Sequence, residues 1–317
     1  MNLTTILLQF FALILAPVLA PLLTGWINQC RAWLQNRSAP PLLQPYYQLG
    51  KLFEKEVVLA HNASGVFRAA PYFIFAAMVL AATIIPTLST DLPFGPAADA
   101  IALVGIFALA RVFIALAGMD VGTSFGTLGA RREMLVGFLA EPALLMSIFT
   151  ASLISHSTSL STIVDTLGHR EFVIYPSLAF AGVAFTMVSL AENARIPVDN
   201  PTTHLELTMI HEAMILEYSG RHLALIEWAA ALKMYAYSCL GLALFFPWGV
   251  PQDVTLSNLS LALAGLLFKL AIGGALLALI ETLSAKMRIF RAPEFLGTAF
   301  MLAVLGMLVH LLLETGK

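Results

Sequence analysis

The chain has 317 residues, of which 59% are hydrophobic and only 11% are charged, and its mean hydropathy is +0.85. Ordinary soluble domains carry about 25% charged residues, so the composition excludes a soluble fold and indicates an integral membrane protein. The formal net charge of −2 is uninformative, but basic patches interleaved with aromatic residues are missing from the sequence, so we expect no nucleic-acid partner.

Eight apolar segments are long enough to cross a lipid bilayer, which takes about 20 mainly apolar residues. They cover residues 4–26, 69–89, 98–118, 133–155, 174–194, 223–247, 257–281 and 295–315. The sequence shows no internal repeat and no low-complexity linker between them. We therefore predict an all-α bundle of about eight transmembrane helices, which forms a single polytopic membrane domain over residues 1–317.

The basic residues between these segments lie almost entirely on one side of the predicted bundle. Twelve lysines and arginines fall in the loops 27–68, 119–132, 195–222 and 282–294, whereas the opposite side holds only Arg170 and Lys317. Short loops rich in lysine and arginine usually face the cytoplasm. The pattern therefore predicts that these four loops are cytoplasmic and that both termini lie on the outer side.

The first of these loops contains an amphipathic stretch. Residues 41–56 alternate leucine, tyrosine and phenylalanine with glutamine, lysine and glutamate, and the stretch is too short and too charged to span the membrane. It predicts an interfacial helix on the cytoplasmic side. An ordinary surface loop segment is the alternative.

Cysteine and histidine spacing gives no sign of a metal centre or cofactor held by this chain alone. The two cysteines, Cys30 and Cys239, do not form a C-x-x-C motif, which excludes an iron–sulfur cluster ligated only by this chain. His204 and His211 are seven residues apart with no third ligand nearby, so we expect no zinc site.

Acidic residues are concentrated in one stretch, between Glu192 and Glu227. Six of the 19 acidic residues lie there, and elsewhere they are scattered singly. Ionisable residues also occur inside the predicted spans, where each costs about 2.5–3.5 kcal/mol near the bilayer centre. They predict either a relay of titratable groups for protons or buried ion pairs that lock the helices together. The relay set comprises Glu141, Glu192, Glu206, Glu212, Glu217, Glu227, Asp199, Lys233, Lys269 and Arg111.

Three loop motifs resemble one known family. They are Lys51–Glu56 in the first loop, Asp120–Glu133 before the fourth span, and the residues Arg195–Asp199, Glu206-Leu207 and Glu217–Gly220 in the acidic loop. Together they resemble the membrane subunit that complex I (its subunit 1) shares with membrane-bound [NiFe]-hydrogenases and formate hydrogenlyases, including the hydrogenase component C type. The resemblance covers the whole chain.

The resemblance implies a subunit of a bacterial inner-membrane oxidoreductase complex that is not catalytic alone. It implies partners with [NiFe] and iron–sulfur centres, namely hydrogenase-like large and small subunits and an iron–sulfur subunit, together with antiporter-like membrane subunits. It further implies that the acidic residues form a proton-path entrance. Residues implied in docking the electron-transfer arm or lining a quinone-like cavity are Arg37, Gln44, Lys51, Glu54, Glu56, Arg131, Arg132, Arg195 and Tyr218.

Departures from the complex I pattern fall in the part that shapes a quinone cavity. Where many family members have R-x-G-P, this chain has Arg37–Pro40, in which alanine replaces the glycine. Where they have P-F-D, it has Pro197–Asp199, in which valine replaces the phenylalanine. Its acidic loop is also about three residues longer than that of complex I-type members. We therefore expect an energy-converting hydrogenase or formate hydrogenlyase type of subunit. The alternative is the quinone-site subunit of a complex I-type enzyme, and a freestanding carrier or a purely structural anchor are the remaining hypotheses.

Overall fold

The computed structural model describes residues 3–91, 93, 98–169, 175–199, 209–251, 256–287 and 289–315. Over these residues the fold is helical, with one isolated β-bridge between Asp99 and Ser159. The predicted all-α membrane fold is therefore confirmed.

Seven of the described helices are long and apolar enough to cross a membrane. They are α1 (Leu3–Leu34), α3 (Gly65–Ile84), α4 (Ala100–Asp120), α5 (Ser124–Ser155), α9 (Gly220–Phe245), α10 (Leu256–Leu283) and α11 (Ala292–Thr315). The segment predicted over 174–194 forms α7 (Pro176–Glu192), whose 17 residues extend about 26 Å and lie at the short end of the range for a span.

Two helices differ clearly from their predicted bounds. Helix α1 continues past residue 26 to Leu34, and α5 begins at Ser124 rather than at residue 133. The early start of α5 has a local cause, because the Thr123 hydroxyl accepts a hydrogen bond from the Gly126 amide at 3.3 Å and so caps the helix. Helix α5 therefore carries the charged residues Arg131 and Arg132, which hydropathy assigns to a loop.

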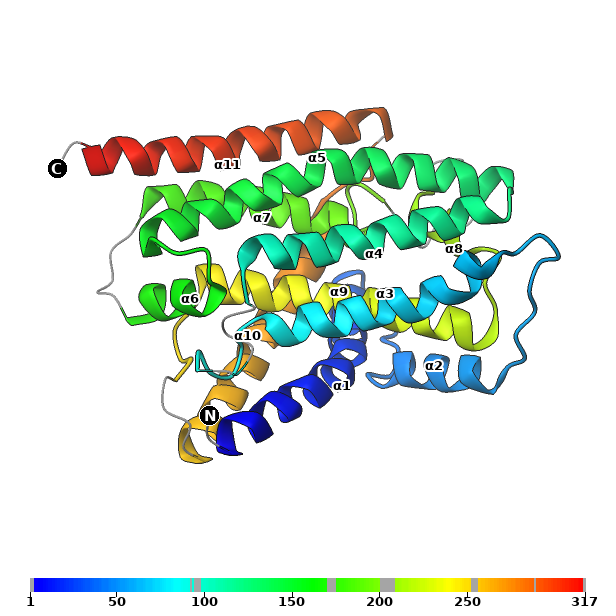
Figure 1. The fold of residues 1–317 in the computed structure, drawn as a ribbon, viewed down its shortest axis with the longest axis horizontal. Helices are drawn as coiled ribbons and strands as arrows, with labels where there is room; N and C mark the ends of the chain where they lie inside the picture. The colour runs from blue at the N-terminus through cyan, green and yellow to red at the C-terminus, as the bar shows by residue number, and fades with distance from the viewer. Residues whose placement is uncertain are drawn as a thin grey trace.

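The helices pack side by side in an elongated bundle (Figure 1). Helix α11 packs on α5 and α7, α4 joins α5 to α3, and α9 contacts α1, α3 and α7. Helix α10 packs mainly on α1. The start of α1 and the end of α11 lie at the same end of the bundle, on the left of Figure 1. We call the opposite end, which carries α2 (Gln44–Glu54) and the exposed Arg37, Arg68, Arg131 and Arg221, the basic end.

Helix α2 confirms the amphipathic helix predicted in the first loop, over residues 44–54. It lies beside α1 and α9 at the basic end and has no buried residue. The Tyr46 hydroxyl donates a hydrogen bond to the Val18 carbonyl, and the Phe53 ring meets the Trp228 ring edge-on at 6.2 Å. These contacts hold α2 against two long helices.

Two further helices are short. Helix α6 (Leu160–His169) lies at the end opposite the basic end, and α8 (His211–Ile215) is a single turn between α7 and α9 that packs on α5 and α4. Residues 200–208, which belong to the acidic loop, lie outside the described residues.

Candidate functional site: a buried ion network

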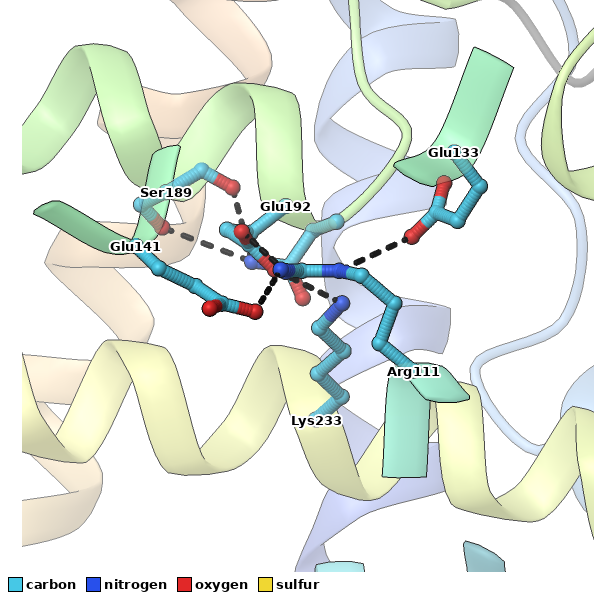
Figure 2. A network of polar contacts seen from close by, with 7 residues as sticks. Arg111, Glu133, Glu141, Ser189, Glu192 and Lys233 are labelled. Atoms are coloured by element: carbon cyan, nitrogen blue, oxygen red, sulfur yellow. Dashed lines mark hydrogen bonds and ion pairs between the residues drawn. The ribbon is translucent and has the colours of Figure 1, made fainter. Parts of the chain in front are cut away.

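Arg111 of α4 is the centre of an ion network between four helices (Figure 2). Its guanidinium donates hydrogen bonds to Glu141 of α5 and Glu192 of α7, and its Nε lies 3.4 Å from Oε1 of Glu133. The Lys233 ammonium, on α9, lies 2.9 Å from Oε2 of Glu192. With all five groups ionised, three carboxylates face two cations, which leaves a net charge of −1.

The spacing of residues on α5 shapes this network. Glu133, Gly137 and Glu141 are four residues apart, so they lie on one face of the helix. The Arg111 side chain crosses that face at Gly137, where an added Cβ would lie 2.6 Å from the Arg111 Cδ. Because Gly137 has no side chain, Arg111 can reach both glutamates.

Glu192 is the most deeply enclosed acid of the network. Its side chain is 1% exposed, and it is the last residue of α7. The side-chain amide of Asn193, the next residue, caps the helix end by donating to the Ser189 carbonyl at 2.8 Å. Burying an unpaired carboxylate costs several kcal/mol of desolvation free energy. The two cations that contact Glu192 offset this cost. Four members of the predicted relay set, Arg111, Glu141, Glu192 and Lys233, are thus in contact with one another.

A cavity of about 80 Å³ adjoins the network. Arg111, Glu133, Glu192, His211 and Lys233 line it, together with apolar side chains of α3, α4 and α9. A water molecule takes up about 30 Å³ in the liquid, so the cavity has room for at least two. Polar groups from five helices therefore share one small hydratable space.

A second buried acid, Glu281 at the end of α10, joins three parts of the chain. Its carboxylate lies 3.2 Å from Arg195, in the loop after α7, and 3.6 Å from Arg31 of α1. The same loop is held to the residues after α10 by a hydrogen bond from the Met287 amide to the Pro197 carbonyl at 2.9 Å. Sequence reasoning did not single out Glu281, because it is the last residue of a predicted span and looks like an ordinary boundary charge.

The three motif loops meet at the basic end. The Tyr218 hydroxyl donates to the Phe67 carbonyl at 2.8 Å and its ring stacks on the Phe67 ring at 3.9 Å. The Ser219 hydroxyl accepts from the Val58 amide at 2.8 Å and donates to the Val58 carbonyl at 2.9 Å. Burial, and secondarily the charge of Asp120, raise the pKa of Tyr218, so the phenol keeps the proton that it donates. We call these contacts of Tyr218 and Ser219 the loop latch.

The third motif loop contacts the acidic loop as well. Arg132 donates to the Met209 carbonyl at 3.1 Å, and the buried Asp199 carboxylate accepts from the amides of Ile210 and His211 at 3.2 and 3.3 Å. Asp199 and Arg132, predicted from the motifs, therefore fix the backbone around α8.

The other predicted acids lie nearer the surface. Glu217 and Glu227 are exposed and Glu212 is half-buried. Glu227 lines a cleft of about 310 Å³ between α1, α2 and α9, which also includes Asn28, Gln48 and Lys51. Glu206 lies outside the described residues.

Lys269, a member of the predicted relay set, lies apart from the ion network. Its ammonium donates to the carbonyls of Phe246 and Trp248, just beyond the end of α9. Cations favour this position because the last carbonyls of a helix carry partial negative charge. Hydropathy gives depth along a helix but not the direction of a side chain, so it could not separate Lys269 from Lys233.

The residues implied in docking divide into two groups. Exposed side chains at or near α2 and at the start of α5 belong to Arg37, Gln44, Lys51, Glu54, Glu56 and Arg131. Arg132, Arg195 and Tyr218 are directed into the contacts described above. Within the described part of the chain, no group of three or more histidine, cysteine or acidic residues is arranged to hold a metal ion, and Cys30 and Cys239 are both buried and unpaired with each other.

Comparison with known proteins agrees with the resemblance in the loop motifs. The chain is 34% identical to formate hydrogenlyase subunit 4 of Escherichia coli (strain K12) over 295 residues, which cover 93% of this chain and 95% of that protein. It is 33% identical to hydrogenase-4 component C of the same organism over 303 residues, covering 94% and 95%. An NADH-quinone oxidoreductase subunit of Cytophaga hutchinsonii is 30% identical, with 68% of each chain covered.

The fold is also found in a solved structure. A chain of the membrane-bound sulfane sulfur reductase, an archaeal respiratory membrane complex, matches with a TM-score of 0.81 at 20% identity, covering 96% of this chain and 98% of that one. The family model described as NADH dehydrogenase matches residues 6–312. Since this match spans nearly the whole chain, the protein belongs to the NADH dehydrogenase family of membrane subunits, of the complex I subunit 1 type.

Proposed function

We propose that this chain is the membrane subunit that anchors the electron-transfer arm and forms the proton-path entrance in an energy-converting hydrogenase or formate hydrogenlyase type of complex. It carries no redox centre of its own and is not catalytic alone. The similarity to formate hydrogenlyase subunit 4 and hydrogenase-4 component C over more than nine-tenths of the chain supports this branch of the family.

The observation that carries the proton-path role is the buried ion network beside a hydratable cavity. Glu192 shares its charge between Arg111 and Lys233, and Glu141 is 32% exposed on the far side of Arg111. Carboxylates tied to cations in this way can change protonation when a neighbouring charge moves, because the interaction is strong where water is scarce. The negative net charge of the network favours taking up a proton.

The exposed charges of the basic end support the anchoring role. Under the proposal this end faces the cytoplasm of a bacterial inner membrane, because lysine and arginine accumulate in its loops. It would contact hydrogenase-like large and small subunits with [NiFe] and iron–sulfur centres and an iron–sulfur subunit. Antiporter-like membrane subunits would pack beside the helices.

Glu141→Gln tests the proton-path role in the assembled complex. The amide keeps the shape of the side chain but cannot carry a proton, so we expect redox-driven proton uptake by inverted membrane vesicles to fall at least about tenfold. The complex should still assemble, as judged by co-purification of its subunits. Glu294→Gln, at an exposed acid in the first turn of α11, is the matched control. Normal proton uptake with poor assembly in Glu141→Gln would instead favour a structural anchor.

The cleft between α1, α2 and α9 favours one alternative, a quinone-site subunit of a complex I-type enzyme. Its volume of about 310 Å³ is within the range of small-molecule sites, and it combines apolar Leu49 and Leu52 with polar Asn28 and Gln48. Quinone retained in the purified complex, or inhibition by quinone-site blockers that is weakened by Leu52→Trp, would support this alternative. Absence of both would support the hydrogenase type.

A further inference from the structure

Helix α8 is held in a fixed position between α4 and α5 by small residues. An added Cβ at Gly129 would lie 2.8 Å from the Ile210 carbonyl oxygen and 2.9 Å from the Ala213 Cβ, and one at Gly118 would lie 3.1 Å from the Met214 Cβ. Ala213 and Met214 are 3% and 2% exposed. The close packing of α8 therefore fixes the direction of its first residue, His211.

His211 is also tied at its backbone. Its amide donates to the Asp199 carboxylate, which is 3% exposed and also accepts from the Ile210 amide. The imidazole is half-buried and lines the cavity of about 80 Å³ together with Glu133, Glu192 and Lys233. One or two water molecules in that cavity could connect the imidazole to the ion network.

The charge of His211 also interacts with that of Glu227 on α9. Glu227 lines the separate cleft between α1, α2 and α9, and its side chain is exposed. His211 thus lines the cavity beside the ion network and is coupled electrostatically to an exposed carboxylate. Neither the loop motifs nor the acidic pattern of the sequence pointed to this histidine.

We propose that His211 is the proton-relay residue between Glu227 and the cavity that adjoins Glu192 and Lys233. This inference rests on the proton-path role proposed above. One ring nitrogen takes a proton from the Glu227 side and the other releases one to cavity water, so one N–H bond forms as the other breaks. The ring is then neutral in the opposite tautomer, and rotation of the ring restores the starting arrangement. Histidine suits this role because its charge ordinarily changes between about pH 5 and 8.

The charged groups around His211 fit a transient imidazolium. Glu212 follows it on α8, Glu227 approaches from α9, and Glu133 and Glu192 line the cavity from α5 and α7. Arg111 and Lys233 lie on the cavity side and oppose a lasting positive charge there. The carboxylates around the ring therefore favour its transient protonation, while the two cations on the cavity side oppose a lasting positive charge.

The test uses the assembled complex in inverted vesicles. We expect His211→Gln to reduce redox-driven proton uptake at least about tenfold while the subunits still co-purify. In His211→Ala, free imidazole added to the buffer should restore a large part of the rate, which a structural role would not allow. His61→Gln, at an exposed histidine of the same end, is the matched control and should leave the rate unchanged.

Three outcomes would overturn the relay. They are normal proton uptake in His211→Gln, a loss in His211→Ala that imidazole does not reverse, and failure of both variants to assemble, which would make His211 a structural residue. The proposed function fails separately, when Glu141→Gln keeps normal proton uptake. If proton uptake were lost in Glu141→Gln but normal in His211→Gln, the proposed proton path would be supported and only the role of His211 would be refuted.

Discussion

Gly137 decides how closely Arg111 can approach the two carboxylates of α5. A methyl group at this position would overlap the Arg111 side chain, since the added Cβ would lie 2.6 Å from its Cδ and 2.8 Å from its Cζ. We expect Gly137→Ala to destabilise the protein by about 1–3 kcal/mol, the usual cost of overpacking. Thermal unfolding of the detergent-purified protein measures this change.

Gly105→Ala, in the first half of α4, is the control for this substitution. An added Cβ there meets no atom of the described chain within 4 Å, and alanine favours a helix over glycine by about 1 kcal/mol. The control should therefore be neutral or slightly stabilising. Equal unfolding temperatures for the two variants would mean that Arg111 moves aside freely and that Gly137 does not shape the network.

At the residue scale, the sequence predicted most of the ion network but not all of it. Arg111, Glu141, Glu192 and Lys233 stood out because ionisable groups are costly inside apolar spans. Glu133 did not, since hydropathy placed it at the first residue of a span, although its spacing of four from Gly137 and eight from Glu141 is visible in the sequence. His211 was considered only as a metal ligand, and its place beside the cavity depends on tertiary packing.

At the element scale, the loop latch connects the first loop to the start of α9. The Tyr218 hydroxyl pairs with the Phe67 carbonyl at 2.8 Å, in a buried position. Tyr218→Phe keeps the ring that stacks on Phe67 but leaves this carbonyl without its donor, which costs about 1–3 kcal/mol. We expect faster limited proteolysis between α2 and α3 in the variant, measured by mass spectrometry of the fragments.

Tyr72→Phe is the control for the loop latch. Tyr72 lies on α3, 48% exposed, and its ring meets His222 edge-on at 5.7 Å, so loss of its hydroxyl should leave the proteolysis rate unchanged. If Tyr218→Phe were cut no faster than this control, the hydroxyl would not hold the loop, and ring stacking with the Ser219 contacts would suffice.

The elements themselves were more predictable than their ends. Each predicted span overlaps a described helix because about 20 apolar residues have few alternatives in a bilayer, where backbone groups must bond internally. The start of α5 was misplaced because the Thr123 cap lies in the stretch 119–132, which hydropathy assigns to a loop. The pairing of motif loops across the basic end could not be derived, since it depends on contacts between residues more than 150 positions apart, such as Tyr218 with Phe67.

At the scale of the whole molecule, the Arg111 ion network and the ion pairs of Glu281 join different sets of helices. The Arg111 network lies among α4, α5, α7 and α9, whereas Glu281 ties α10 to α1 and to the loop after α7. Helix α10 is mostly exposed apart from its contact with α1, where Gly274 admits the Trp26 ring and the Trp26 indole donates to the Ala271 carbonyl at 2.8 Å. The Glu281 contacts therefore fix the end of a helix that is otherwise loosely enclosed.

The orientation of the whole molecule can be measured with single cysteines, because both native cysteines are buried and can be replaced by alanine. Ser38→Cys places a thiol at the exposed basic end, and Thr162→Cys places one on the exposed side of α6 at the opposite end. If the basic end is cytoplasmic, a membrane-impermeant maleimide should label intact spheroplasts only at position 162, and should label position 38 in inverted vesicles. The reverse pattern would place α2 and the cavity with His211 on the outer side, where they could not meet a cytoplasmic electron-transfer arm, and would refute both the anchoring role and the direction of the proton path.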